Sequence, residues 1–216
     1  MYIEESARPA TCRPMIALTF DDGPTAATEQ ILDVLESNGA KATFFVVGRR
    51  IDAWRDTVLR IHESGNEVSN HTFTHQSLLL PLADDEVARE LRSTGEAIAS
   101  VIGKAPPPFF RPPGGRMDGR LLRLSGELGY AIILWNIDPR DWENRNADMV
   151  YDHIMRGARD GAIIVLHDTH HATALAMEKV IPELIEQGYD LVTVSELLRR
   201  NGSGEPVPGS VYRHVE

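Results

Sequence analysis

The stretch Met15-Ile-Ala-Leu-Thr-Phe-Asp-Asp-Gly-Pro24 decides the fold, because an apolar run typical of a buried strand ends in two adjacent carboxylates. Neighbouring side chains at a strand end point in different directions, so Asp21 and Asp22 can take different roles. One can bind a metal ion while the other faces a substrate. Asp-Asp-Gly-Pro is also good chemistry for a turn or a helix cap, which is the simpler interpretation of the isolated motif. Its position directly after an apolar run favours a functional site.

Apolar, strand-like runs alternate with amphipathic, helix-like segments along the chain. We expect strands at residues 15–20, 42–47, 67–70, 109–111, 130–135, 162–167 and 191–193, and helices at residues 25–38, 52–64, 84–102, 119–128, 147–158, 172–186 and 194–200. About seven βα units in one domain predict a parallel sheet that closes, or nearly closes, into a barrel. A doubly wound open sheet is the alternative.

Composition limits the classes of function that the chain can have. Its 216 residues suit one domain, and 42% hydrophobic with 25% charged residues indicate a folded core rather than disorder. The net charge of -10 makes nucleic acid a poor partner and favours a neutral polymer or a small molecule. No apolar stretch approaches the length of a membrane-spanning helix, and no signal peptide is visible. Cys12 is the single cysteine, so we expect no intrachain disulfide.

Two histidines four positions apart, His71 and His75, follow the strand expected at 67–70. On a helix they would share one face and could chelate one metal ion. With one carboxylate of Asp21 and Asp22 they make a three-ligand set for a divalent metal, and the other carboxylate remains as a base. Two unrelated surface histidines are the simpler interpretation of the pair alone. Ser, Asn and Thr residues around them can hydrogen-bond to ligating imidazoles and favour the metal site.

Three more polar groups stand at or after the ends of expected strands, where the chemistry of a parallel barrel gathers. His167 ends one strand and is a candidate general acid or base, although a lone histidine beside an apolar strand is usually a core residue. Arg111 ends another strand, and Asp141 follows a third with Trp142 beside it. A structural ion pair and a polar loop are their simpler interpretations. Their shared position at strand ends makes the set specific.

These residues stand in five motifs that resemble the polysaccharide deacetylases, the NodB-homology domain of carbohydrate esterase family 4. The first motif is Thr19-Phe-Asp-Asp-Gly-Pro24, and the second is His71-Thr-Phe-Thr-His75. The third is Arg111-Pro-Pro-Gly-Gly115, the fourth spans Asp138 to Trp142, and the fifth lies within Ile164-Val-Leu-His167. Five motifs in the family's order, spread over residues 14–200, make the resemblance specific.

The resemblance implies a distorted (β/α)7 barrel of the NodB-homology type as the catalytic domain over residues 14–200, with an N-terminal extension at 1–13 and a loose tail at 201–216. It implies one divalent metal ion, most often zinc, with cobalt or nickel as alternatives. The family's pattern assigns roles residue by residue: Asp22, His71 and His75 as metal ligands, Asp21 as general base, His167 as general acid, Arg111 orienting the base, Asp141 tuning the acid, and Trp142, Leu166, Pro113 and Gly114 along the substrate cleft.

Gly114 departs from the family's third motif, in which a tyrosine occupies this position. The family uses the backbone N–H of that tyrosine as a donor to the oxyanion, and glycine keeps this N–H. The side chain at the cleft wall is lost, and the Gly-Gly pair leaves the loop freer. We therefore expect a more open cleft and a changed choice of substrate.

The resemblance implies an enzyme that removes the N-acetyl group from N-acetylglucosamine units of chitin oligomers or peptidoglycan by means of metal-activated water. O-deacetylation of acetylated xylan is a close alternative, because the same site can perform it. Hydrolysis of a small cyclic amide and a non-catalytic carbohydrate-binding barrel are further alternatives, which the intact metal motif and the retained polar positions disfavour. Since such polymers lie outside the cytoplasm, the resemblance implies a secreted or cell-envelope protein.

Overall fold

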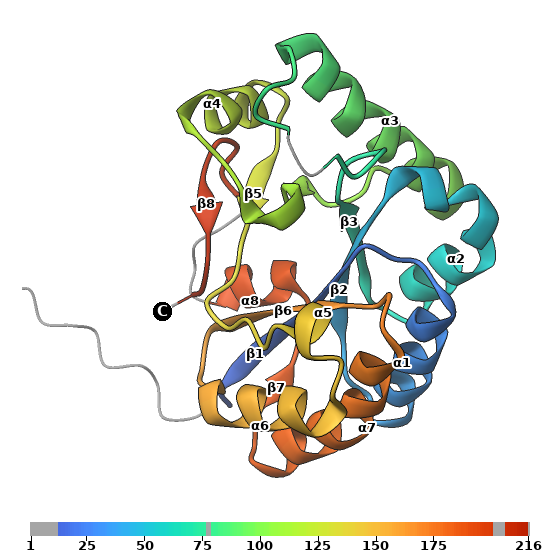
Figure 1. Cartoon of the computed structure of the whole chain (residues 1–216), viewed down its shortest axis with the longest axis vertical. Helices are drawn as coiled ribbons and strands as arrows, with labels where there is room; N and C mark the ends of the chain where they lie inside the picture. Colours follow the sequence, from blue (N-terminus) through green and yellow to red (C-terminus); the bar gives the residue numbers. More distant parts are fainter. Residues whose placement is uncertain (1–12, 77–78, 201–205, 216) are drawn as a thin grey trace, which may run out of the picture.

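The centre of the protein is a curved parallel sheet surrounded by helices, in a computed structural model that describes residues 13–76, 79–200 and 206–215 (Figure 1). The strands are β1 (Met15–Asp21), β2 (Ala42–Val46), β3 (Glu67–Asn70), β4 (Phe109–Phe110), β5 (Ala131–Ile133), β6 (Ala162–His167), β7 (Asp190–Leu191) and β8 (Val211–Tyr212). The α-helices are α1 (Ala26–Ser37), α2 (Arg55–Glu63), α3 (Asp84–Ile102), α4 (Gly119–Glu127), α5 (Asp141–Asn144), α6 (Ala147–Gly157), α7 (His171–Glu186) and α8 (Val194–Arg200). Short 3-10 helices are η1 (Gly48–Arg50), η2 (Asp52–Trp54) and η3 (Pro113–Gly115).

The strands pair in the order β6-β1-β2-β3-β4-β5-β8, and β7 pairs with the first residues of β1. Every one of these strand pairs is parallel. The chain beyond β5 returns to β6 through a bridge between Ile137 and Ile164, and His214 forms an antiparallel bridge with Ala162. These contacts join the two ends of the sheet. The expected distorted barrel is therefore confirmed, and the alternative of a doubly wound open sheet is wrong.

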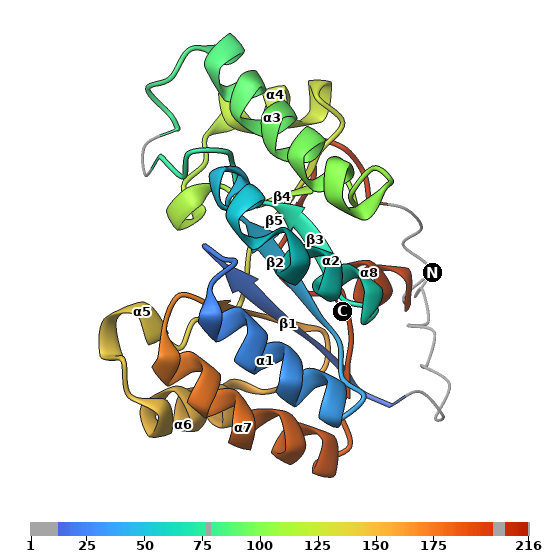
Figure 2. The ribbon, with the colours of Figure 1, turned by 90° about the vertical axis from the view of Figure 1, so that its right-hand side faces the viewer.

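Helices cover the outside of the barrel, as two perpendicular views show (Figures 1 and 2). Helices α1, α6 and α7 pack together on one side, α2 and α3 pack over β3, and α4 packs against β5. The carboxyl ends of the strands are left to line a cavity at one mouth of the barrel. This is the end at which parallel barrels carry their functional residues.

Side chains alternate between the helix layer and the barrel interior, because successive residues of a strand face opposite sides. In β1, Leu18 and Phe20 belong to the large cluster under the helices, whereas Ala17 belongs to the interior cluster with Phe45. The same alternation turns Asp21 inward, at the mouth of the barrel. The alternation along β1 thus makes Asp21, and not the following Asp22, face the barrel interior.

Helix boundaries follow the capping residues that the sequence offers. Thr25 caps α1 by accepting a hydrogen bond from the N–H of Ala27, and Asn146 caps α6 by accepting from the N–H of Met149. Helix α3 ends at Gly103, whose φ of 73° suits glycine. The expected long helices therefore form close to their predicted positions. Within the described ranges, no helix has the length and apolar character needed to cross a membrane.

The C-terminal residues differ from the loose tail expected over 201–216. Residues 201–205 and 216 lie outside the described part of the chain, as do residues 1–12 of the expected N-terminal extension, but Val211–Tyr212 forms β8 beside β5. The N–H of Leu134 donates to the carbonyl oxygen of Tyr212, and the N–H of Val215 donates to that of Gly161. The Gly, Pro and Ser content predicted no regular structure, but an open strand edge supplies partners that composition does not reveal.

Candidate active site

His71 and His75 lie in an irregular loop after β3, and not on the helix that their four-residue spacing suggested. Thr72 and His75 have positive φ values of 67° and 55°, so the backbone turns sharply between the two histidines. The imidazole rings still approach one another, with centroids 5.0 Å apart. The expected helical face is wrong, but the loop achieves the same convergence.

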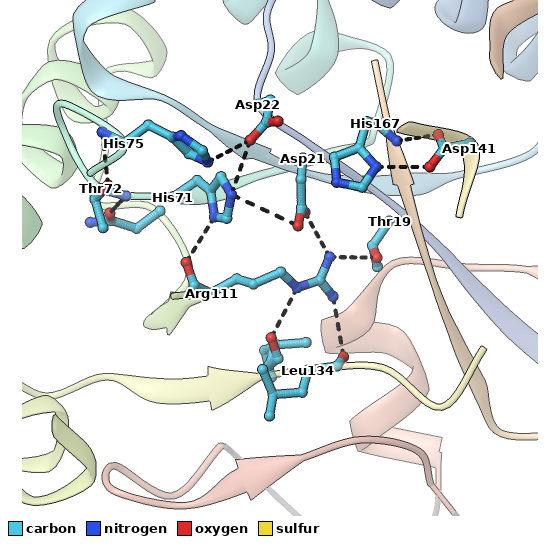
Figure 3. Close-up of polar contacts among 12 residues, drawn as sticks. Thr19, Asp21, Asp22, His71, Thr72, His75, Arg111, Leu134, Asp141 and His167 are labelled. Carbon is cyan, nitrogen blue, oxygen red and sulfur yellow. Dashed lines mark hydrogen bonds and ion pairs between the residues drawn. The ribbon is translucent and has the colours of Figure 1, made fainter. Parts of the chain in front are cut away.

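Asp22, His71 and His75 direct their donor atoms at one spot, and we call them the metal-ligand set (Figure 3). Asp22 Oδ1 lies 2.8 Å from His75 Nε2 and 3.2 Å from His71 Nε2, and the three donors lie within 4.8 Å of one another. His71 Nδ1 is 2.8 Å from the carbonyl oxygen of Arg111, which can only accept a hydrogen bond. That nitrogen therefore carries the proton, and Nε2 keeps a lone pair for a metal. One carboxylate and two imidazoles fit a divalent ion with an open coordination position.

Polar contacts from α3 hold the loop that carries these histidines. One oxygen of Glu90 accepts from the N–H groups of Phe73 at 2.9 Å and Thr74 at 2.7 Å, and the other accepts from the Thr74 hydroxyl at 2.9 Å. Asn70 accepts from the N–H of Thr72 at 2.9 Å and donates to a backbone carbonyl of α3 at 2.7 Å. The role of Glu90 could not be predicted from the sequence, because nothing in its local sequence distinguishes it from the other acids of that helix.

Asp21 is buried and takes a different direction from Asp22. Its Oδ1 accepts a hydrogen bond from Arg111 at 2.7 Å, whereas Oδ2 lies 3.9 Å from His71 Nε2, beside the metal-ligand set. The side chain of Arg111 is fully buried and also donates to the Thr19 hydroxyl at 2.7 Å and to the carbonyl oxygen of Ile133 at 2.9 Å (Figure 3). Because its guanidinium is fixed by several hydrogen bonds, Arg111 holds the Asp21 carboxylate in one orientation, with Oδ2 facing the cavity.

His167 and Asp141 form a second pair in the same region. Asp141 is fully buried, and its Oδ1 lies 2.8 Å from His167 Nδ1. Its Oδ2 accepts from the N–H of His167 at 2.8 Å and from the hydroxyl of Thr173 at 2.7 Å. Burial lowers the pKa of His167, but the hydrogen bond to Asp141 and the charge of Asp141 outweigh burial and raise the pKa to about 9. The imidazole is therefore charged at neutral pH and can donate a proton from Nε2.

A cavity of about 490 Å³ at the mouth of the barrel joins these groups, and we call it the catalytic cavity. It is lined by the metal-ligand set, by Asp21 and by His167. Gly114, Pro113 and Trp142 lie on its wall as the sequence predicts, and four residues that the sequence analysis did not assign to it also line it: Arg116, Trp135, Asp138 and Val165. Gly114 has a φ of 64°, and a Cβ there would meet nothing within 4 Å. The cleft is therefore open at the position of the family tyrosine.

Leu166 does not line the catalytic cavity. Its side chain is fully buried in the cluster under the outer helices, and Val165 lines the cavity instead. Residues one apart on a strand face opposite sides, so the position before the inward-facing His167 must face outward. The assignment of Leu166 to the substrate cleft is therefore corrected to Val165. The two-residue period of this strand is the signal that could have predicted it.

Gly23 allows the loop after β1 to pack closely against the loop after β6. A Cβ at this position would lie 2.1 Å from Oδ2 of Asp168, a buried carboxyl that accepts a hydrogen bond from the Thr28 hydroxyl at 2.5 Å. The backbone of the loop and this carboxyl are thus in direct contact, which only glycine permits. The glycine of Asp-Asp-Gly-Pro therefore serves packing at the site as well as turn formation.

The fold and these contacts define a class of (β/α)7-barrel protein in which an Asp-His-His metal-ligand set and a charged histidine share one cavity. The chain belongs to the polysaccharide deacetylase family, because the family model described as "Polysaccharide deacetylase" matches residues 8–133. The family expected from the five motifs is confirmed.

Two curated relatives are similar to most of the chain. The peptidoglycan-N-acetylmuramic acid deacetylase PdaC of Bacillus subtilis is 40% identical over 184 residues, which are 85% of this chain and 38% of the relative. A peptidoglycan-N-acetylglucosamine deacetylase of Bacillus cereus is 39% identical over 191 residues, which are 86% of this chain and 88% of the relative. The chain thus spans less than half the length of the first relative and most of the second.

Two solved structures share the fold. The Xyl-CE4 domain of a multidomain xylanase from the hindgut metagenome of Trinervitermes trinervoides has a TM-score of 0.87 and 32% identity, covering 94% of this chain and 98% of that chain. A family 4 acetyl xylan esterase of Clostridium thermocellum, in complex with a cobalt ion, has a TM-score of 0.84 and 31% identity, covering 93% of this chain and 98% of that chain. Both have the same distorted barrel fold as this chain.

Proposed function

We propose that this chain is a metal-dependent N-deacetylase of N-acetylglucosamine units in peptidoglycan or chitin oligomers. The observation that carries the proposal is a pair of proton-transfer groups in one cavity, with Asp21 held by Arg111 and His167 held by Asp141. Hydrolysis of an amide needs a base for the attacking water and an acid for the leaving amine. Asp21 and His167 line the same cavity as the metal-ligand set, which supports these roles.

Asp22, His71 and His75 would hold the metal ion through one carboxylate oxygen and two imidazole nitrogens. When bound, the ion supplies a Lewis acid that polarises the acetyl carbonyl and lowers the pKa of bound water. We propose zinc, because three protein ligands of this kind with one open position are typical of its hydrolytic sites. Cobalt and nickel are alternatives that the same donors accept.

Side chains of this protein then move the protons. Asp21 accepts the proton of the attacking water at Oδ2, because Oδ1 is engaged by Arg111. His167 donates its Nε2 proton to the leaving nitrogen, because Nδ1 is engaged by Asp141. The backbone N–H of Gly114, on the wall of the catalytic cavity, is the candidate donor to the carbonyl oxygen as that oxygen gains negative charge.

Acetylated xylan is the second candidate substrate, because the similar structures include a xylanase domain and an acetyl xylan esterase. An ester releases its alcohol more easily than an amide releases its amine, so an ester depends less on a general acid. The charge on His167 therefore supports an amide substrate. The two curated relatives, which are deacetylases of N-acetylated sugars of peptidoglycan, support it as well.

The proposed substrates also set where the protein would act. Peptidoglycan and chitin lie outside the cytoplasm, so we place the activity in the cell envelope or outside the cell. The curated relatives named above act on peptidoglycan, which supports the same location.

Acetate release from peptidoglycan, chitin oligomers and acetylated xylan, measured with metal-stripped and zinc-restored protein, tests the proposed function. We expect release from the N-acetylated substrates, loss of it on metal removal and recovery with zinc. A His167→Ala variant should lose more rate on the amides than on the xylan ester.

Full activity after metal removal would contradict the proposed mechanism, and equal losses on amide and ester would contradict the role of His167. Saccharide binding without acetate release, with zinc, cobalt and nickel each supplied, would indicate a non-catalytic carbohydrate-binding barrel.

A further inference from the structure

A second cavity, of about 230 Å³, adjoins the catalytic cavity and shares Asp22 and His75 with it. Arg49 and Arg50 line it together with Thr169 and His170, and we call it the arginine cavity. The arginines follow β2, and the other two residues follow β6. Both cavities therefore lie at the same mouth of the barrel, with the metal-ligand set between them.

The backbone of the two arginines is fixed to the loop that carries the metal-ligand histidines. The N–H of Gly48 donates to the carbonyl oxygen of Thr72 at 2.9 Å, and the N–H of Arg49 donates to that of Phe73 at 3.0 Å. A Cβ at Gly48 would lie 2.5 Å from the ring of Phe73, so glycine is required for this close approach. The arginines therefore have a defined position relative to the metal-ligand set.

The two guanidinium groups have no polar partner among the residues that the structure describes. Within residues 13–76, 79–200 and 206–215, neither Arg49 nor Arg50 makes a side-chain hydrogen bond or an ion pair. Arg60, by contrast, is paired with Asp33 and Glu36.

Arg49 and Arg50 bring two positive charges to one cavity of a chain whose net charge is -10. These charges stand beside the Asp22 carboxylate, which also lines the cavity, and a divalent ion bound to Asp22 would add to the positive charge at this edge. An anionic group is the chemistry that such an edge attracts.

We propose that the arginine cavity is a subsite for a carboxylate of the substrate, beside the sugar whose acetyl group is removed. A guanidinium presents a planar fork of donors that matches a carboxylate. The cavity is smaller than sites that enclose a drug-sized ligand, so its size suits an acidic substituent rather than a whole sugar.

The inference rests on the proposed function and sharpens its substrate class. It selects glycans that carry carboxylates over neutral chitin oligomers. In peptidoglycan, a muramic acid without a stem peptide carries the carboxylate on its lactyl group, and a muramic acid with a stem peptide carries carboxylates on the peptide instead. The lactyl group and the stem peptide would each present a carboxylate to the arginines. Substrates with and without the peptide separate these two sources.

The test compares kcat/KM for three soluble saccharides of equal length: a neutral chitin oligomer, a muramic acid saccharide without peptide, and the same saccharide with its stem peptide. We expect kcat/KM of the Arg49→Gln/Arg50→Gln variant on a carboxylate-bearing saccharide to fall about tenfold or more, because the loss of a hydrogen bond to a charged group has an effect of this size. On the neutral oligomer it should stay close to wild type. Loss only on the saccharide without peptide indicates the lactyl carboxylate, loss only with the peptide indicates the stem, and loss on both indicates that the cavity accepts a carboxylate from either source.

The Arg156→Gln/Arg159→Gln variant is the matched control, because it removes the same charge from exposed positions at the end of α6. It should leave all three substrates unchanged. Equal losses on the neutral and acidic saccharides, or no loss on any, would overturn the inference.

Equilibrium binding of the same saccharides to metal-stripped protein separates this inference from the proposed function. Weaker binding of the acidic saccharide by the Arg49→Gln/Arg50→Gln variant would support the carboxylate subsite even if the wild type released no acetate. Equal binding of acidic and neutral saccharides by both proteins would reject the subsite while leaving deacetylation intact.

Discussion

At the scale of single residues, the charge of His167 depends on one neighbour. Burial lowers the pKa of this imidazole, but the hydrogen bond to Asp141 and the charge of Asp141 have the larger effect and raise the pKa to about 9. Because a general acid must be protonated, activity should fall as the pH rises through about 9. Asp141→Asn can keep a hydrogen bond but removes the charge, so the alkaline limb of the kcat profile should move to lower pH. An alkaline limb at the same pH in both proteins would contradict this role of Asp141.

Gly23 is a second position at which one residue decides the local structure. In Gly23→Ala the new Cβ would lie 2.1 Å from the buried carboxyl of Asp168, so either that side chain or the loop carrying Asp21 and Asp22 must shift. Overpacking of this kind costs about 1–3 kcal/mol, which thermal or denaturant unfolding can measure. Gly119→Ala is the control, because a Cβ there meets nothing within 4 Å. Equal stability of the two variants would show that the contact with Asp168 is relaxed at no cost.

At the scale of elements, α3 shapes the metal-ligand set although it supplies no ligand. Glu90→Ala would remove three hydrogen bonds to the loop that carries His71 and His75. Mutation of a group that orients ligating residues typically lowers metal affinity by about tenfold to a hundredfold. The zinc dissociation constant, measured by competition with a chelating dye, should rise by that factor. Glu96→Ala removes an exposed acid of the same helix and should not change it; equal constants in both variants would contradict the role of Glu90.

The sequence predicts which polar residues meet at this mouth, because strand ends can be located from apolar runs and a parallel barrel brings its strand ends together. It does not predict the path between them. The spacing of His71 and His75 suggested a helix, yet Thr72 and His75 adopt positive φ in a loop that Glu90 fixes from a distant helix. Leu166 was assigned by motif membership, and the alternation of β6 turns it away from the cavity.

At the scale of the whole molecule, the last described residues close the barrel. They contribute hydrogen bonds to β5 and to the start of β6, including those from Leu134 to Tyr212 and from Val215 to Gly161. The sequence could not predict this, because the pairing depends on the free edge of β5 rather than on the composition of the tail itself. Closure of the barrel is thus a non-local property of the chain.

A chain ending at residue 205 should therefore be less stable than the full chain. Each lost backbone hydrogen bond contributes about 0.5–1.5 kcal/mol, so the Tm should fall by several degrees. Val207→Ser is the control within the same segment, because its side chain is exposed and makes no such contact. A shortened chain that unfolds at the Tm of the full chain would show that the strand edge of β5 does not need β8.

The central claim concerns the adjacent carboxylates of Asp21 and Asp22: Asp21 acts as the general base, and Asp22 binds the metal ion. Zinc content and turnover, measured on the same preparations of Asp21→Asn and Asp22→Asn, test it most directly. Asp21 bonds to Arg111 and Asp22 lies against both histidines, so Asp21→Asn should keep zinc and lose turnover, whereas Asp22→Asn should lose zinc. Equal zinc content in the two variants would contradict this division of roles.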